Sequence, residues 1–159
     1  MTSPLHIVLY QPEIPANTGN IMRLCFLNRF RLHLIEPLGF SLDDAALRRA
    51  GIDYWDKFRS AVEVHPDWDA FTARYPEAPT LALFFTAHTS RSFWDAEYPD
   101  PAWLIFGRET AGLPQEFHTR YANQLVTIPK RSDEGRSLNL SNAVAIAAYE
   151  GLRRMQGRG

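Results

Sequence analysis

The chain alternates short apolar runs of strand length with stretches whose apolar residues recur at helical spacing. This alternation constrains the fold more than any other feature, because strands separated by helices form parallel sheets covered on both faces. Six runs are predicted to be strands, at residues 5–10, 31–36, 61–65, 81–86, 102–107 and 124–129. Helices are predicted over residues 21–30, 66–75, 115–121 and 141–155, with a short one opened by residues 41–44. We therefore expect an α/β fold, a mostly parallel sheet flanked by helices, in a single domain spanning residues 1–159.

Polar residues suited to capping stand before the predicted helices. Asn17 and Gly19 would form the turn that starts the first helix, and Ser41 or Asp43 would cap the short one. Ser141 or Asn142 lies near the start of the last helix. These residues have an ordinary structural use before any functional one.

Charge and composition narrow the class of protein. The 17 basic and 18 acidic residues give a net charge of −1, which by itself argues against a strong nucleic-acid binder. The distribution is uneven, since residues 61–100 carry 2 basic and 7 acidic side chains while residues 101–159 carry 8 and 5. Fifteen of the 17 cations are arginine. Arginine forks onto phosphate and stacks on bases, although an arginine-rich genome would give the same bias.

Cys25 is the single cysteine, which excludes an internal disulfide and a cysteine-based zinc site. Near the N-terminus, the apolar run at residues 5–9 is short and no basic segment precedes it, so we expect neither a signal peptide nor a membrane span, and a cytoplasmic protein. The histidines are dispersed along the chain, at His6, His33, His65, His88 and His118. Each is expected to be structural or solvated, and no metal site is predicted.

Ligands of open α/β sheets bind beyond the carboxyl ends of the strands. The loop after the first predicted strand, QPEIPANTGN, lacks the GxGxxG fingerprint of dinucleotide-binding folds. The sequence also lacks the P-loop lysine motif, HExxH and the GxSxG elbow. These absences exclude the commonest nucleotide-binding, metalloprotease and hydrolase sites.

Three segments resist a purely structural interpretation. The first is NTGNIMR, residues 17–23, in which Arg23 stands among apolar neighbours one turn into a helix. We expect its guanidinium to be buried and to require an anion, either an internal carboxylate or a substrate. The second is FGRETAGLP, residues 106–114, where Gly107 would let a ligand approach the backbone and Gly112 would adopt positive φ. Two glycines bracketing Arg108 and Glu109 indicate a shaped binding loop.

The third segment is RSLNLSNA, residues 136–143. Helix capping requires one serine or asparagine, and here there are four in alternation. The excess indicates hydrogen bonds offered to a ligand or to another part of the chain.

Taken together, NTGNIMR, FGRETAGLP and SLNLSNAVAIAAYE resemble, in this order, the motifs of the SPOUT superfamily of RNA methyltransferases, in its 2′-O-ribose group. LIEPLGF (34–40) and LRRAGIDYW (47–55) further resemble the subgroup that modifies the wobble nucleotide, position 34, of tRNA. The resemblance covers about residues 5–152. It implies a SPOUT fold whose C-terminal segment forms a trefoil knot, a feature that composition and periodicity do not predict.

The resemblance also implies a cofactor, partners and site residues. The cofactor would be S-adenosylmethionine, with contacts at Phe84, Gly107, Ile128, Ser137 and Leu138. The catalytic and substrate-positioning residues would be Arg23, Asn17, Glu109 and Asn139, with Ser137 shared between the two sets. The partners would be tRNA and a second copy of the chain, in a homodimer with the active site across the interface. No membrane and no DNA would be involved.

Arginine cannot readily act as a base, so we expect Arg23 to clamp a phosphate and stabilise charge on the attacking oxygen. Backbone contacts to tRNA are predicted at Arg48, Arg49, Arg131, Arg136, Arg153 and Arg154, any of which would otherwise belong to a solvated surface. The alternatives are 2′-O-methylation of another tRNA position or of ribosomal RNA, and a non-catalytic RNA-binding protein on the same fold. A third is an adaptor that uses the fold only to dimerise.

Overall fold

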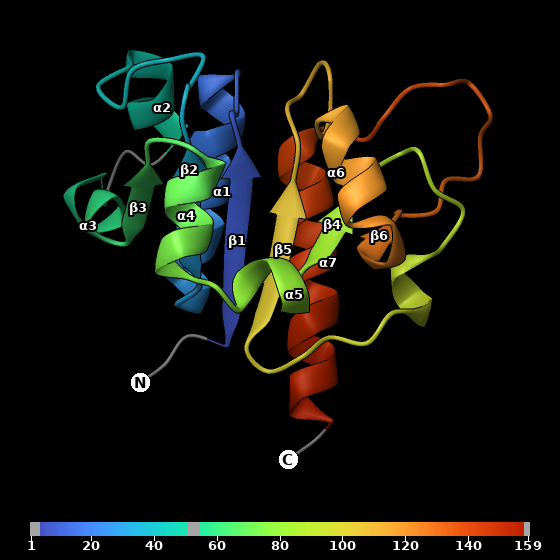
Figure 1. The fold of residues 1–159 in the computed structure, drawn as a ribbon. Coiled ribbons are helices and arrows are strands. Elements are labelled where there is room, and N and C mark those ends of the chain that lie inside the picture. The colour runs from blue at the N-terminus through green and yellow to red at the C-terminus, as the bar shows by residue number, and fades with distance from the viewer. Residues whose placement is uncertain (1–3, 51–54, 158–159) are drawn as a thin grey trace.

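A computed structural model describes residues 4–50 and 55–157 and shows one parallel sheet with helices on both faces (Figure 1). The strands are β1 Leu5–Tyr10, β2 Arg31–Ile35, β3 Val62–His65, β4 Leu83–Phe85, β5 Ala102–Phe106 and β6 Leu125–Val126. Their order across the sheet is β3-β2-β1-β5-β4-β6, and every neighbouring pair is parallel. The predicted α/β architecture, with strands in the six predicted places, is confirmed.

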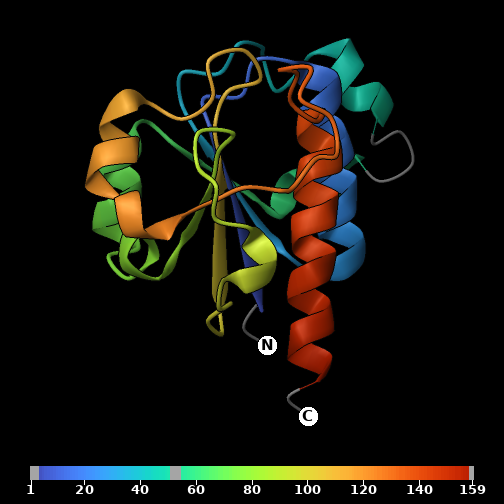
Figure 2. The same ribbon diagram turned by 90° about the vertical axis from the view of Figure 1, so that its right-hand side faces the viewer.

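The helices form two layers (Figure 2). Viewed along the sheet edge, α1 and α7 lie on one face, and α4 and α6 on the other. The bounds are α1 Pro15–Asn28, α2 Ala45–Ala50, α3 Trp55–Ser60, α4 Trp68–Arg74, α5 Ala78–Leu81, α6 Gln115–Arg120 and α7 Leu140–Gln156. Two short 3-10 turns, η2 Phe93–Asp95 and η3 Ala122–Gln124, complete the described elements. In the described part of the chain, no helix combines the length and the apolar character of a membrane span.

The fourth strand is shorter than predicted because Leu81 and Ala82 belong to the end of a short helix. Residues 78–81 form the single turn α5, closed by a hydrogen bond from the Ala82 N–H to the Ala78 carbonyl. The strand therefore begins at Leu83. An apolar run at the junction of a short helix and a strand gives no periodic signal that separates the two.

The first helix starts earlier than its polar residues predict. Pro15 occupies the first turn, where its fixed φ and missing N–H cost nothing. Asn17, Thr18 and Gly19 consequently lie inside the helix and are buried, so the predicted turn at Asn17 and Gly19 is wrong. This shift directs Asn17 toward the carboxyl edge of the sheet.

The other two predicted caps each move to a neighbouring residue. The α2 helix follows Asp44, whose carboxylate accepts a hydrogen bond from the Ala46 N–H at 2.8 Å, so the cap is neither Ser41 nor Asp43. The cap of α7 is Asn139, two residues before Ser141 and three before Asn142, which were the predicted caps. In both cases the acceptor is the last polar residue before the helical hydrogen bonds begin.

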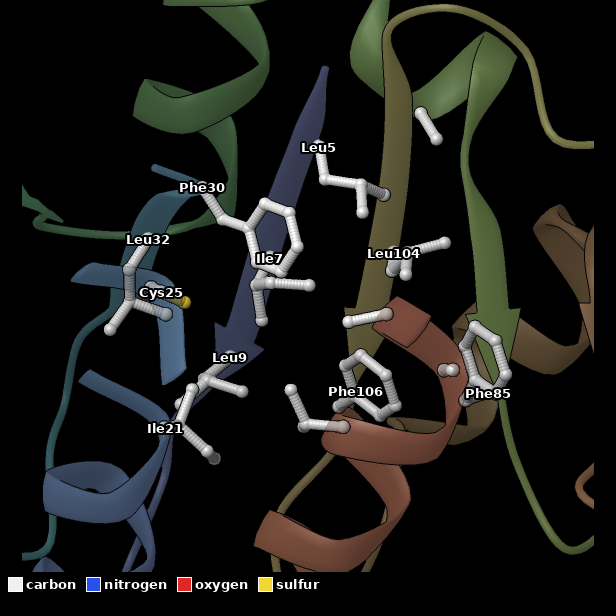
Figure 3. Packing of buried hydrophobic residues seen from close by; sticks show 14 of the residues in the cluster. Leu5, Ile7, Leu9, Ile21, Cys25, Phe30, Leu32, Phe85, Leu104 and Phe106 are labelled. Atoms are coloured by element: carbon white, nitrogen blue, oxygen red, sulfur yellow. The ribbon is translucent and has the colours of Figure 1, made fainter. Parts of the chain in front are cut away.

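Alternate residues of the central strands pack into two separate cores. Leu5, Ile7 and Leu9 of β1 face the α1 and α7 layer (Figure 3), whereas Val8 joins the aromatic cluster under α4 and α6. Cys25 lies in the first core, and burial raises the pKa of its thiol. A buried, protonated thiol has little reactivity, so Cys25 is a packing residue.

Candidate active site

A pocket of about 570 Å³ lies at the carboxyl ends of β4, β5 and β6. The three segments that resisted a structural interpretation meet here. Eight residues predicted for the site or for RNA contact line this pocket: Asn17, Gly107, Glu109, Ile128, Arg136, Ser137, Leu138 and Asn139. Phe85, Phe106 and Leu140 form an apolar wall, and the cations Lys130 and Arg136 lie on the lining. The pocket combines an apolar wall with basic groups at the sheet edge where α/β proteins bind ligands.

The loop after β5 is a tight turn that only glycine permits at its entrance. The Arg108 N–H donates to the Gly112 carbonyl at 3.1 Å, and the Gly112 N–H donates back to the Arg108 carbonyl at 3.0 Å. A Cβ on Gly107 would lie 2.2 Å from the Gly112 carbonyl carbon and 2.3 Å from the Leu113 nitrogen. Gly107 is therefore required by the closure of its own loop, before any ligand approaches.

Glu109 joins this loop to the start of α1. Its two carboxylate oxygens accept hydrogen bonds from the Glu13 N–H at 2.9 Å and the Ile14 N–H at 2.5 Å. In return, the Glu13 carboxylate accepts from the Thr110 N–H at 3.2 Å and the Thr110 hydroxyl at 2.7 Å. These bonds, chiefly the one from the Thr110 hydroxyl, lower the pKa of Glu13. We call this reciprocal set of four hydrogen bonds the loop clasp.

Asn139 connects the third segment to the first. Its side-chain oxygen accepts from the backbone N–H groups of Ser141 at 2.9 Å and Asn142 at 3.3 Å, and from the Ser141 hydroxyl at 2.6 Å. Its side-chain nitrogen donates to Asn17 Oδ1 at 3.0 Å. One asparagine thus caps α7 and orients a buried amide in the pocket wall, which accounts for Asn139 and Ser141 among the four Ser and Asn residues of this segment.

The segment between β6 and α7 forms an exposed arm along the pocket. Residues 129–139 are all exposed, and the Lys130 ammonium donates to the Arg136 carbonyl across the arm. Gly135 has φ +73°, a left-handed conformation that favours glycine. Ser137 and Leu138, predicted to contact the cofactor, lie on this arm and line the pocket.

Two predicted site residues are not brought to the pocket. Phe84 is fully buried in the opposite core, where its ring stacks on Tyr121 at 4.3 Å. Its neighbours Phe85 and Thr86 line the pocket instead. Side chains alternate along a strand, so Phe84 and Phe85 face opposite sides of the sheet, and the orientation of β4 places Phe85 on the pocket side.

Arg23 is the second predicted site residue that the structure leaves outside the pocket. It is exposed on the surface of α1 and does not line the pocket, so the predicted burial is wrong. Although α1 is apolar around most of its circumference, one strip of it is left facing solvent at Arg23 and Leu27, where Leu27 is 64% exposed. Solvent satisfies the guanidinium, and no internal carboxylate is needed.

The predicted RNA-contacting arginines divide by position. Arg131 and Arg136 lie on the exposed arm beside the pocket. Arg48 and Arg49 are exposed on α2, where Arg48 lies 3.7 Å from Asp43.

Arg153 and Arg154 lie near the far end of α7, about 15 Å further along the helix than Ala143 at a rise of about 1.5 Å per residue. Arg154 is only 18% exposed, and its guanidinium donates to Glu150 at 2.8 Å and to the Trp94 carbonyl at 2.6 Å. Arg154 thus anchors the η2 turn to α7, and its contact with RNA stays a prediction.

Two polar residues near the pocket, Thr86 and His88, were not predicted to be site residues. Thr86 Oγ1 lies 2.9 Å from His118 Nε2, and the His88 N–H donates to the same hydroxyl at 3.1 Å. Thr86 and His88 line the pocket. The signal available was their position at the carboxyl end of the predicted fourth strand, residues 81–86, which is the edge where ligands bind.

The pocket fits the cofactor that the resemblance implies. Its volume lies in the range of about 300–1,000 Å³ typical of small-molecule sites. The apolar wall of Phe85, Phe106 and Leu140 suits a purine ring, and the lining cations suit a carboxylate. Gly107 and Ile128 line the same space. We conclude that the residues present can hold S-adenosylmethionine.

Comparison with known proteins places the chain among RNA methyltransferases. The model of the SpoU rRNA Methylase family matches residues 4–149. A tRNA (cytidine(34)-2′-O)-methyltransferase of Burkholderia cenocepacia is 49% identical over 149 residues, covering 93% of this chain and 94% of that protein.

Solved structures of RNA methyltransferases have the same fold as this chain. One, described as "Structural insights into the 2-OH methylation of C/U34 on tRNA", is 40% identical with a TM-score of 0.84, and the match covers 98% of this chain and 99% of that one. An AdoMet-bound rRNA methyltransferase from Sinorhizobium meliloti has a TM-score of 0.79 at 23% identity, covering 96% of this chain and 59% of that one, and shares the fold.

Proposed function

Since the chain belongs to the SpoU rRNA Methylase family, we propose that it transfers the methyl group of S-adenosylmethionine to the ribose 2′-hydroxyl of the wobble nucleotide, position 34, of tRNA. The observation that carries the proposal is the convergence of the three motif segments on one pocket, in a chain 49% identical to a tRNA (cytidine(34)-2′-O)-methyltransferase. The acceptor is a 2′-hydroxyl, which DNA lacks, so the partner is RNA. The proposal includes a single SPOUT domain with the trefoil knot of that fold, acting on tRNA in the cytoplasm.

The chain's own residues would act by holding and orienting groups. When bound, S-adenosylmethionine supplies an electrophilic methyl group. Gly107, Ile128, Ser137 and Leu138 would hold it, through the loops that line the pocket. Asn139 would position its neighbours through the α7 cap, and positioning of this kind lowers the barrier of a displacement reaction.

Glu109 is a positioning residue in this scheme. Both of its carboxylate oxygens are engaged by N–H groups at the start of α1, so it fixes the pocket wall and does not take the proton of the hydroxyl. The loop clasp keeps the β5 loop and the first turn of α1 in register. The catalytic geometry therefore depends on two segments about 95 residues apart in the sequence.

The exposed face of α1 and α7 supports a homodimer. Leu27 of α1 is 64% exposed, and Ile146 and Tyr149 of α7 are 42% and 54% exposed. The two helices are neighbours, with the Tyr149 hydroxyl 3.5 Å from Asn28 Oδ1. Large exposed apolar side chains on adjacent helices are typical of a protein interface. We infer that a second copy covers this face.

The same face carries Arg23, one helical turn from Leu27. Because Arg23 lies outside the pocket of its own chain, it would serve the pocket of the partner. There its fork would clamp the phosphate next to the target ribose and stabilise charge on the attacking oxygen. Each active site would then be built from both chains.

The reaction is tested by incubating labelled S-adenosylmethionine with unmodified tRNA and locating the label by nuclease digestion and mass spectrometry. Label on the 2′-oxygen of nucleotide 34 is the expected result, and label at another position would overturn the assignment to the wobble site. Asn139→Ala should lose most activity, because it removes the α7 cap and leaves Asn17 without its partner. The matched control is Asn123→Ala, an exposed asparagine on η3 that should retain activity.

The shared site is tested by mixing two inactive variants, Arg23→Ala and Asn139→Ala, under conditions that exchange subunits. A mixed dimer holds one pocket with an intact Asn139 and an intact Arg23 from the partner. Random pairing makes half of the dimers mixed, so about one quarter of all sites should recover, as site-sharing across a twofold interface requires. No recovery, with mixed dimers verified by native mass spectrometry, would show that Arg23 acts within its own chain.

A further inference from the structure

The register of the sheet gathers histidines that are far apart in the sequence. His33 of β2 is paired with Glu63 of β3, and His65 lies two residues further along β3. Residues two apart in a strand point to the same face, so the three side chains lie together. That face is covered by α4 and packs against Phe71 and Tyr75.

The distances among the three potential ligand atoms are short. His33 Nδ1 lies 3.1 Å from His65 Nε2, and Glu63 Oε2 lies 3.7 Å from each of these nitrogens. A point equidistant from the three atoms is about 2.0 Å from each, which matches zinc bond lengths of about 2.0–2.1 Å to nitrogen and about 2.0–2.2 Å to oxygen. The atoms therefore fit around one ion with little rearrangement.

We propose that His33, Glu63 and His65 bind a divalent transition-metal ion of the zinc class. Two imidazoles and one carboxylate form a donor set that such ions prefer, and three protein ligands leave a fourth position for water. The ion would replace the hydrogen bond between the two rings and join edge strand β3 to β2. This site is separate from the proposed methyl-transfer pocket, which lies beyond β1 at the β4, β5 and β6 side of the sheet.

The surrounding residues orient the ligands as metal sites require. His33 Nε2 lies 3.0 Å from His6 Nδ1, so the second nitrogen of the ring has a hydrogen-bond partner, as it does in metal-ligating histidines. The Glu63 carboxylate accepts from the Tyr75 hydroxyl at 2.8 and 2.7 Å and from the Arg31 guanidinium.

Entry to the site is from the β3 edge. The Glu63 side chain is 20% exposed, whereas His33 is fully buried. Arg74 lies across this entrance with its Nε 3.4 Å from Glu63 Oε2, and its side chain is 65% exposed. An exposed arginine can turn into solvent when an ion enters, and its charge opposes binding while it stays.

The test uses untagged full-length protein freed of metal by chelation, since a polyhistidine tag would itself bind the probe. Co²⁺ is added and visible absorption is recorded, followed by Zn²⁺ competition and calorimetry with Zn²⁺ alone. The expected result is the intense absorption of four-coordinate Co²⁺ at one ion per chain, displaced by Zn²⁺, with a rise in melting temperature. Absence of one-to-one binding would overturn the proposal.

A matched pair of variants assigns the site. Glu63→Gln removes the anionic ligand and should weaken binding by about 100-fold or more, since second-shell changes alone cost about 10–100-fold. Arg74→Gln removes the positive charge beside the Glu63 carboxylate but removes no ligand, so this variant should bind the ion at least as tightly as the wild type. Equal weakening in both, or none in Glu63→Gln, would overturn the assignment.

X-ray absorption of the Zn²⁺-loaded wild type gives a readout that needs no variant. Two imidazoles with oxygen ligands at bonding distance are expected. A zinc shell without imidazole would place the ion elsewhere and refute the site. Methyl transfer is not measured in any of these experiments, so failure here leaves the proposed function standing.

Discussion

Replacing Gly107 by alanine tests how the β5 loop is built. An added Cβ would meet main-chain atoms of Gly112 at 2.2 Å and of Leu113 at 2.3 Å, whereas ordinary contacts begin at 3.4 Å. Backbone cannot rotate away as a side chain can, so the turn must open by more than 1 Å as it relieves the clash. The loop that presents Glu109 and Arg108 to the pocket would move with it.

The loss of stability in Gly107→Ala follows from the contacts that are strained or broken when the turn opens. Overpacking of this kind costs about 1–3 kcal/mol. The two hydrogen bonds between Arg108 and Gly112 contribute about 1 kcal/mol each. We therefore expect Gly107→Ala to lower the free energy of unfolding by about 3–5 kcal/mol, a large part of the roughly 5–15 kcal/mol of a typical domain.

Gly112→Ala is the matched control in the same turn. Gly112 has φ +67° and open space around the added Cβ, so it meets conformational strain without a clash. That strain costs about 1–2 kcal/mol. Urea unfolding followed by circular dichroism gives both values, and methyl transfer gives the effect on the pocket. The reasoning is refuted if Gly107→Ala costs less than Gly112→Ala, or lies within about 0.5 kcal/mol of the wild type.

Three further predictions concern charge and hydrogen bonding. The pKa of Glu150 is lowered from 4.5 to about 2, chiefly by its hydrogen bond with Arg153, so the stability that this group contributes is present above about pH 4.5 and is lost as the pH falls toward 2. In urea unfolding at pH 5, 4 and 3, the free energy of unfolding should therefore fall less steeply with pH in Glu150→Gln than in the wild type, and identical slopes in the two proteins would contradict this. Arg136→Ala should weaken tRNA binding and reduce its salt dependence by about one released ion, while Arg153→Ala should leave the tRNA affinity closer to that of the wild type. Filter binding across a salt series tests both variants, and a larger loss of affinity in Arg153→Ala would show that Arg153, and not Arg136, contacts tRNA. Thr110→Val removes the 2.7 Å hydrogen bond from the Thr110 hydroxyl to Glu13 and should lower the free energy of unfolding by about 1 kcal/mol. The rate of methyl transfer should fall by more than this loss of stability accounts for, and an unchanged rate would show that the loop clasp does not position the pocket.

The site could be predicted in part from the sequence because its residues lie directly after predicted strands. Gly107 and Glu109 follow the fifth strand, and Ser137 and Asn139 precede the last helix. In a parallel sheet such positions meet at one edge. The errors came from side-chain direction. Phe84 is one residue out of phase with the pocket, which only the orientation of β4 decides.

Arg23 illustrates a second limit. Its neighbours on α1 are apolar, and this pattern predicts burial in a single chain. The structure leaves one strip of that helix uncovered, because α7 and the sheet pack against the rest. Periodicity reports that a face is apolar and does not report whether the same chain or a second copy covers it.

By itself, the sequence determined the strand and helix alternation, hence a parallel sheet covered on both faces, and which loops line the pocket. Those properties depend on local patterns that repeat along the chain. The tertiary structure alone decided the contacts between distant segments. It closes Glu109 onto the start of α1, joins Asn139 to Asn17, and sets His33 opposite Glu63. Strand order and register fix these pairs, and neither leaves a periodic signal in the residues themselves.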